Sequence, residues 1–123
     1  MKALDTNVLI SWLLNEGVRE ELTDDAYHIG TVALAELAWV MRTSFGKSRQ
    51  EITRTLNQIL EMPMLRFDDK QTVVRAVSDF NDLPADFPDY LLMHGNLRQG
   101  CEITLTFDKK ASRADGFQLL NKG

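Results

Sequence analysis

The sequence lacks several features that would place it in other classes of protein. Its single cysteine, Cys101, permits no internal disulfide, which is typical of proteins from reducing compartments. No apolar run approaches the roughly 20 residues that span a bilayer, so we expect no membrane-crossing helix and no membrane partner. Asp5 interrupts the first apolar run, which argues against a secretory signal peptide. We therefore expect a cytoplasmic protein.

Positive charge and histidine are also scarce. The net charge of −4 provides no global positive field, so a polyanion would have to bind a local basic patch. Basic side chains cluster between residues 42 and 54 and again after residue 108, where a solvated surface is the simpler explanation. The candidates for polyanion contact are Arg42, Lys47, Arg49, Lys109 and Lys110. His28 and His94 are not spaced to join an acidic cluster, and we expect both to be structural.

Short strand-like segments alternate with amphipathic patterns along the chain. The predicted strands are 2–4, 27–30, 64–67, 102–107 and 117–120, and the predicted helices are 6–15, 31–45, 48–62, 70–82 and one that ends near residue 99. Thr31 is the predicted N-cap of the second helix, Gly46 its stop, and Ser48 with Glu51 a capping box for the third. This alternation predicts a single α/β domain over residues 1–123, with a mostly parallel sheet covered on both faces.

Acidic residues occur where such a sheet binds ligands. Asp5 and Asp108 each follow a predicted strand, and ligands of parallel sheets lie beyond the carboxyl ends of the strands. Glu36 is surrounded by apolar residues in VALAELAWV, which predicts a buried carboxylate. Asp86 and Asp89 precede a helix. Each residue also has a structural explanation, as a helix cap, a turn residue or, for Glu36, a buried ion pair.

A shared location of these acids would favour a metal ion. Carboxylates brought close together repel and raise each other's pKa, and a divalent cation relieves that repulsion. Oxygen ligands favour Mg²⁺ or Mn²⁺ over zinc, and such ions suit phosphoryl chemistry with a metal-activated water. The sequence excludes two other classes of phosphoryl-transfer protein. Asn7 stands where dehalogenase-like phosphatases have their second aspartate, and the absence of a Walker A motif excludes a P-loop NTPase.

Four segments, LDTNVLI, AELAWVM, DFPDYLLM and TLTFDKKA, resemble the PIN-domain nucleases, and specifically the VapC-type toxins of bacterial toxin–antitoxin pairs. The resemblance covers the whole chain in the right order. It implies a three-layer α/β/α fold with a mostly parallel central sheet, a homodimer, dependence on Mg²⁺ or Mn²⁺, and endonucleolytic cleavage of RNA. It also implies an antitoxin that blocks the site and carries the complex to DNA.

The resemblance also assigns roles to individual residues. The acids that match the family's metal-binding and catalytic positions are Asp5, Glu36, Asp89 and Asp108. Asp86 matches a supporting acid, and Asn7 and Thr106 match polar positions that flank the acids. Pro88 and Tyr90 stand where the family has small residues, so we expect the packing beneath this helix start to differ.

The first helix predicts a protein partner. Six of the seven positions from 8 to 14 are apolar, which is wider than the stripe that faces one core. We expect part of this surface to form a groove for an antitoxin segment, with complete burial in the monomer as the alternative. The candidate contacts are Leu9, Trp12, Leu13 and Trp39.

Two other functions stay open at this point. The chain could be a housekeeping PIN nuclease that processes RNA without an antitoxin, or an inactive PIN module that only binds RNA or a partner. Retention of all four acids argues against the second of these.

Overall fold

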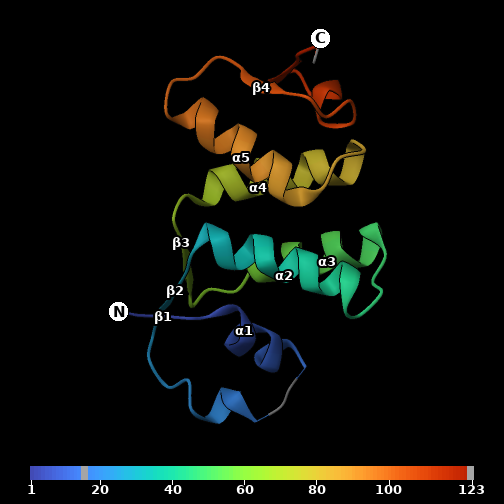
Figure 1. Ribbon diagram of the computed structural model, residues 1–123. Helices are drawn as coiled ribbons and strands as arrows, with labels where there is room; N and C mark the ends of the chain where they lie inside the picture. Colours follow the sequence, from blue (N-terminus) through green and yellow to red (C-terminus); the bar gives the residue numbers. More distant parts are fainter. Residues whose placement is uncertain (15–16, 122–123) are drawn as a thin grey trace.

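The computed structural model describes residues 1–14 and 17–121, and Figure 1 shows their arrangement. The helices are α1 (Thr6–Leu13), α2 (Thr31–Thr43), α3 (Arg49–Leu60), α4 (Lys70–Asp82) and α5 (Phe87–Arg98). The strands are β1 (Lys2–Ala3), β2 (Tyr27–Ile29), β3 (Leu65–Phe67), β4 (Thr104–Thr106) and β5 (Phe117–Leu119). The predicted order of elements is confirmed, although the predicted end of the first helix at Asn15 lies outside the described residues. Two single-turn 3₁₀ helices, Val18–Glu20 and Ala111–Arg113, are too short to produce a periodic pattern in the sequence.

The strand pairs are all parallel, as predicted for an α/β fold. Strands β1, β2 and β3 form one sheet in that order, and β4 pairs with β5 in a second sheet. The α/β class and the parallel strands are thus confirmed, while the prediction of one continuous sheet differs from the two sheets found. Strand β1 has only two residues, both exposed, and therefore offers few ladder bonds to a further strand. Figure 1 shows β4 at the top of the molecule, on the other side of α4 and α5 from β1.

The core lies between the helices and the three-stranded sheet. Helix α3 buries Ile52, Leu56 and Ile59 along one face, as its amphipathic spacing predicts. Helices α4 and α5 pack side by side, with the rings of Phe80 and Phe87 edge to face at a centroid distance of 6.1 Å. This packing fixes the start of α5.

Helix ends follow the predicted signals, with one exception. The Ser48–Glu51 capping box is present, and Gly46 after α2 has a φ of 60°, a conformation that favours glycine. Thr31 is not an N-cap, however, because it is the first residue of α2 and Gly30 precedes it as the cap. Since Gly30 has no side chain, the carboxylate of Asp68 after β3 accepts hydrogen bonds from the Thr31 amide and hydroxyl instead, both at 2.8 Å. These bonds attach α2 to the end of β3.

Candidate functional site

The first pair of predicted acids lies where β1 leads into α1. Asp5 caps α1, and its Oδ1 accepts a hydrogen bond from the Thr6 amide at 2.6 Å. The Thr6 hydroxyl donates to Oε2 of Glu36 on α2 at 2.8 Å. Asp5 and Glu36 therefore lie on two sides of one threonine, at the carboxyl end of β1 as predicted.

Glu36 is exposed, so the prediction of a buried carboxylate is wrong. Helix α2 buries only one face, which consists of Leu34, Leu37, Ala38 and Met41. The apolar neighbours Val32 and Trp39 are 71% and 57% exposed, respectively. Because only one face of α2 is covered, the Glu36 carboxylate needs no buried counter-charge and is accessible to a ligand in solvent.

The second group of acids begins at the N-terminus of α5. Asp86 is the N-cap, and Asp89 completes a capping box in which its Oδ2 accepts from the Asp86 amide at 3.2 Å. Burial raises the pKa of Asp89, the Asp86 amide opposes this effect, and the charges of Asp108 and Asp86 raise the pKa further. Asp89 is therefore within electrostatic reach of two other carboxylates.

Asp108 lies two residues after β4, at the start of a turn. Its Oδ1 accepts hydrogen bonds from the Lys110 amide at 2.8 Å and the Ala111 amide at 3.3 Å. The Asp108 amide in turn donates to the Thr106 hydroxyl at 3.0 Å, so Thr106 contacts the backbone of Asp108. Asn7 is exposed, and among the described residues no hydrogen bond joins it to an acid.

The structure thus brings the predicted acids together in two groups, one of Asp5 with Glu36 and one of Asp86, Asp89 and Asp108. No cluster of three acidic, histidine or cysteine side chains within the described ranges is close enough to hold a metal ion. The chemistry of the donors nevertheless fits a hard divalent cation, because every predicted ligand is a carboxylate. Burial is the main cause of the raised pKa of Asp89, and the charges of Asp108 and Asp86 add a repulsion that such a cation would relieve.

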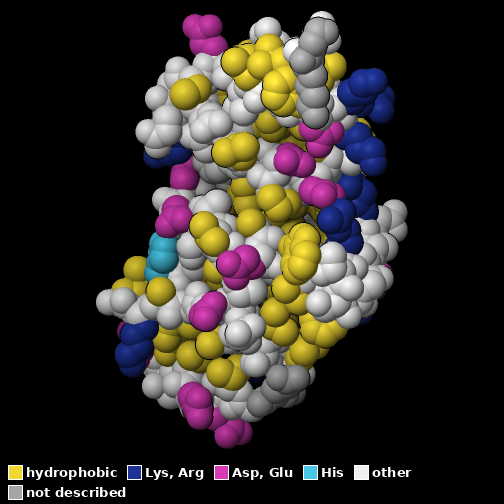
Figure 2. Space-filling view, in the orientation of Figure 1, with side chains coloured by type: hydrophobic (Ala, Val, Ile, Leu, Met, Phe, Trp, Pro, Cys, Tyr) yellow, Lys and Arg dark blue, Asp and Glu magenta, His cyan; other side chains and the backbone are white. Residues whose placement is uncertain are grey.

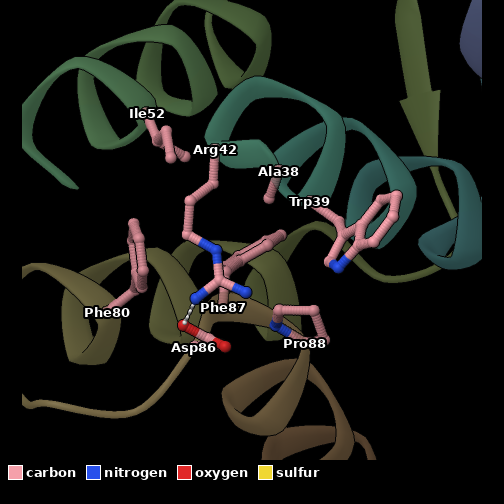
Figure 3. A pocket seen from close by; sticks show the side chains of 8 residues that line it. All are labelled: Ala38, Trp39, Arg42, Ile52, Phe80, Asp86, Phe87 and Pro88. Carbon is pink, nitrogen blue, oxygen red and sulfur yellow. Dashed lines mark hydrogen bonds and ion pairs between the residues drawn. The ribbon is translucent and has the colours of Figure 1, made fainter. Parts of the chain in front are cut away.

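The supporting acid Asp86 forms an ion pair with Arg42, one of the residues predicted to contact a polyanion. Nη1 of Arg42 on α2 lies 2.9 Å from Oδ1 of Asp86, and both side chains are about half exposed. Figure 3 shows this ion pair beside the Pro88 ring and the indole of Trp39. The pair connects α2 to the start of α5 and offsets the charge of Asp86.

Arg49 is directed into the protein instead of toward a polyanion. Its guanidinium donates to the carbonyl oxygens of Phe80, Leu83 and Ala85 and lies 4.1 Å from the centre of the Phe80 ring. The Ala85 amide donates to the buried Tyr90 hydroxyl at 2.8 Å. Arg49 and Tyr90 therefore hold the loop before α5.

The remaining basic candidates are at the surface. Lys47, Lys109 and Lys110 are exposed, and Lys47 lies 3.8 Å from Glu51. On the face seen in Figure 2, dark blue basic side chains gather along one edge next to magenta acidic ones. Positive charge is therefore local, as expected from the negative net charge.

An apolar groove of about 300 Å³ lies between α1, α2 and α3. Its lining consists of Ile10, Leu13, Leu14, Leu37, Met41, Phe45, Lys47, Thr55 and Gln58. Leu13 lines the groove as predicted, whereas Leu9 and Trp12 are 0% and 7% exposed and do not reach it. Trp39 is also absent from this lining and instead borders the recess that holds Arg42 and Asp86. A surface groove is thus present, with a different set of residues.

Both histidines have structural partners, as predicted. His28 Nε2 lies 2.8 Å from Asp68, and His94 Nε2 lies 2.6 Å from Asp79.

A family model described as "PIN domain" matches residues 2–117. The chain belongs to the PIN domain family. PIN domains are in general metal-dependent nucleases, so the match agrees with the carboxylate chemistry described above. No curated protein and no solved structure matches the chain. No helix in the described part of this PIN domain has the length and apolar character to span a membrane.

Three residues with clear roles around the site were not predicted as such. Thr6 lies inside the LDTN motif, and its position next to Asp5 was the signal that could have found it. Asp68 and Arg49 act through backbone groups 37 and 31 or more residues away, and no sequence spacing indicates such contacts.

Proposed function

We propose that this PIN domain is an Mg²⁺- or Mn²⁺-dependent endoribonuclease that acts in the cytoplasm as the toxin of a toxin–antitoxin pair. The family match over residues 2–117, with a carboxylate at each of the four predicted positions, is the observation that carries the proposal. The toxin role rests on the likeness to VapC-type sequences in the four segments quoted above.

The proposed ligands of the cation are Asp5, Glu36, Asp89 and Asp108. When bound, the metal supplies an activated water and neutralises charge on the phosphate oxygens. The chain's own groups orient these carboxylates: the Thr6 amide and hydroxyl contact Asp5 and Glu36, and the Asp86 amide contacts Asp89.

The histidines limit the chemistry open to the protein. Ribonucleases that use the RNA 2′-hydroxyl as nucleophile often rely on a histidine acid–base pair. His28 and His94 are bonded to two separate aspartates, Asp68 and Asp79, and neither of these is a proposed ligand. We therefore propose that water attacks phosphorus and that the 3′-oxygen leaves, which gives a 5′-phosphate and a 3′-hydroxyl.

The products of cleavage test this proposal. Purified protein is incubated with RNA in Mg²⁺ or in EDTA, and the fragment ends are identified by mass spectrometry. We expect cleavage only with the cation, 5′-phosphate ends, and continued cleavage of a substrate with one 2′-deoxy nucleotide at the scissile position. Cleavage in EDTA or a 2′,3′-cyclic phosphate end would contradict the proposed mechanism.

We further propose that Lys47, Lys109 and Lys110 bind the RNA backbone, with Arg42 joining them once its bond to Asp86 opens. Removal of each cation that binds a phosphate should weaken binding to all sequences and reduce the salt slope by about one. The triple lysine-to-alanine variant is compared with Lys70→Ala, which removes an exposed lysine elsewhere. An unchanged salt slope would show that these residues do not bind RNA and are only part of a solvated surface.

The apolar groove is the proposed antitoxin site. Its rim includes Leu14 and Phe45, which are 53% and 46% exposed, and apolar side chains in a groove suit an amphipathic segment. Leu14→Asp should weaken antitoxin binding, whereas Leu92→Asp on α5, at a leucine that is 56% exposed, should not. Equal affinities for both variants would place the antitoxin elsewhere.

We also propose a homodimer and a higher-order complex that the antitoxin attaches to DNA. Light scattering of each component and of the complex tests the assembly.

A further inference from the structure

Two polar side chains in the described residues are buried, Thr6 at 4% exposure and Thr72 at 8%. Both hydroxyls donate to a carboxylate, but one acceptor lies at the start of the threonine's own helix and the other lies on a different helix. Thr72 donates to Asp69 within the first turn of α4. Thr6 donates to Glu36, which lies 30 residues away on another helix. The Thr6 hydroxyl therefore joins two elements that both carry a proposed ligand.

The position of Thr6 explains why its hydroxyl is free to reach another helix. A threonine inside a helix can bond the carbonyl of the preceding turn, but Thr6 is the first residue of α1 and has no such turn before it. Its hydroxyl instead reaches Glu36 Oε2 at 2.8 Å, while the Ala33 carbonyl lies at 3.4 Å. The shorter bond goes to the carboxylate.

The bonds of Thr6 leave one oxygen of each carboxylate open. The Thr6 amide occupies Oδ1 of Asp5, and the Thr6 hydroxyl occupies Oε2 of Glu36. Within the described residues, Oδ2 of Asp5 and Oε1 of Glu36 have no hydrogen-bond partner. Because both donors of Thr6 are neutral, the two carboxylates are held in place without loss of their charge, as cation binding requires.

We propose that Thr6 is a positioning residue that sets Asp5 and Glu36 relative to each other for a divalent cation. The inference rests on the proposed metal-dependent function and goes beyond it by assigning a role to a residue outside the carboxylate set. Groups that orient metal ligands in this way typically contribute 10- to 100-fold to metal affinity.

The main test compares three variants by a direct measurement of Mn²⁺ binding without RNA, from the decrease of the free-ion electron paramagnetic resonance signal. Thr6→Val keeps the branched shape but removes the hydroxyl, and we expect it to bind Mn²⁺ roughly 10-fold more weakly. Thr6→Ser keeps the hydroxyl and should bind within about 3-fold of the wild type on the same basis. Thr72→Val, which removes the matched hydroxyl away from the acids, should bind as the wild type does.

Stability in EDTA separates positioning from packing. Glu36 is exposed and can be rehydrated when the hydroxyl is removed, so Thr6→Val should melt close to the wild type without metal. Thr72→Val should melt at a lower temperature because the N-cap carboxylate of Asp69 loses the hydrogen bond from the Thr72 hydroxyl. A Thr6→Val protein that melts lower in EDTA but binds Mn²⁺ normally would show a packing role and overturn the inference. If Thr6→Val does not fold, Thr6→Ala and Thr6→Ser provide the same hydroxyl comparison.

The failures of the two proposals are distinguishable. A wild type that binds Mn²⁺ and cleaves RNA, with a Thr6→Val variant equal to it in both, overturns the inference alone. A wild type that neither binds Mn²⁺ nor cleaves RNA overturns the proposed function and with it the role of Thr6. A double variant, Thr6→Val with Glu36→Gln, should bind Mn²⁺ no more weakly than Glu36→Gln does, because the hydroxyl acts through Glu36.

Discussion

The two groups of acids in this PIN domain are organised by different physical means. Asp5 and Glu36 are exposed, and the amide and hydroxyl of Thr6 hold them. Asp89 is half buried beside Asp86 and Asp108, and the resulting repulsion adds to the effect of burial in raising its pKa. The first group is therefore held by the hydrogen bonds of one residue, whereas the second contains a repulsion between carboxylates that a cation would relieve.

The two groups also differ in the residues that hold their helices in place. Asp68 holds the N-terminus of α2 and thus the helix of Glu36 through hydrogen bonds from Thr31. Arg49 holds the loop before α5 and thus the start of the helix of Asp89 through three carbonyl oxygens. One helix is positioned by an anion and the other by a cation, so changes in charge should affect the two groups differently.

The largest expected effect is loss of cleavage when either group lacks a proposed ligand. Asp5→Asn and Asp89→Asn should each reduce kcat/KM by roughly 10²-fold or more, since metal coordination supplies several kcal/mol to the transition state. The amide oxygen of Asn can still accept the hydrogen bond from the Thr6 amide at position 5 or from the Asp86 amide at position 89, so both proteins should fold. Asp115→Asn, at an exposed acid of the segment after Asp108, is the control. Full activity of either ligand variant in a fluorogenic RNA assay would remove that residue from the site.

The next effect concerns the anchor of the second group. Arg49→Met should lower the free energy of unfolding by about 2 kcal/mol because three carbonyl oxygens are left without their donor. Arg54→Met, at an exposed arginine of the same helix, should change it by less than about 0.5 kcal/mol. Urea unfolding monitored by circular dichroism measures both values. Equal reductions in the two variants would show that the loop does not depend on Arg49.

The elements with long periodic patterns could be predicted, and the contacts between them could not. The spacing of apolar residues in α3 and its capping box are local signals, and both were predicted correctly. The division into two sheets was not, because strands of two or three residues do not encode which strand lies beside them. The burial of Glu36 was predicted wrongly for a related reason. Its apolar neighbours Val32 and Trp39 could have been buried, but no other part of the protein packs over them.

The site shows the same division between local and distant signals. Asp5 is the N-cap of α1 and Asp89 lies in the first turn of α5, so their places at helix starts followed from capping patterns in the sequence. The bond from Thr6 to Glu36 depends on how α1 meets α2, and the direction of Arg49 into the protein depends on the loop before α5. These contacts come from packing between helices, which composition and periodicity do not determine.

A smaller effect concerns how Asp89, in the second group, changes the stability of the protein without metal. The pKa of Asp89 is raised in the folded protein, so its contribution to stability is present below the unfolded pKa and is lost as the pH rises through the folded pKa. At neutral pH, Asp89→Asn should therefore raise the free energy of unfolding in EDTA, by less than about 1 kcal/mol because solvent screens a half-buried group. Thermal melts with EDTA and with Mg²⁺ test this. Mg²⁺ should stabilise the wild type more than the variant, and equal gains would contradict a ligand role.

The smallest effect is an acid-side change at the anchor of the first group. Hydrogen bonds from the amide and hydroxyl of Thr31 lower the pKa of Asp68, with a further contribution from His28. The sign is opposite to that of Asp89, because the stability from Asp68 is present above its unfolded pKa and is lost as the pH falls through its folded pKa. About half of the Asp68 side chain is exposed, so solvent limits the effect to less than about 1 kcal/mol.

Asp68→Asn should therefore lower the stability at pH 7 slightly and flatten the decline of stability below about pH 4, near the ordinary pKa of an aspartate. Urea unfolding between pH 3 and 7 in EDTA measures this slope, with Asp25→Asn at an exposed aspartate as the control. A parallel acid-side slope in Asp68→Asn and wild type would show that Asp68 does not anchor α2 through its charge. Combined with Asp89→Asn, the result should be additive, because the two carboxylates share no hydrogen-bond partner among the described residues and belong to separately anchored groups.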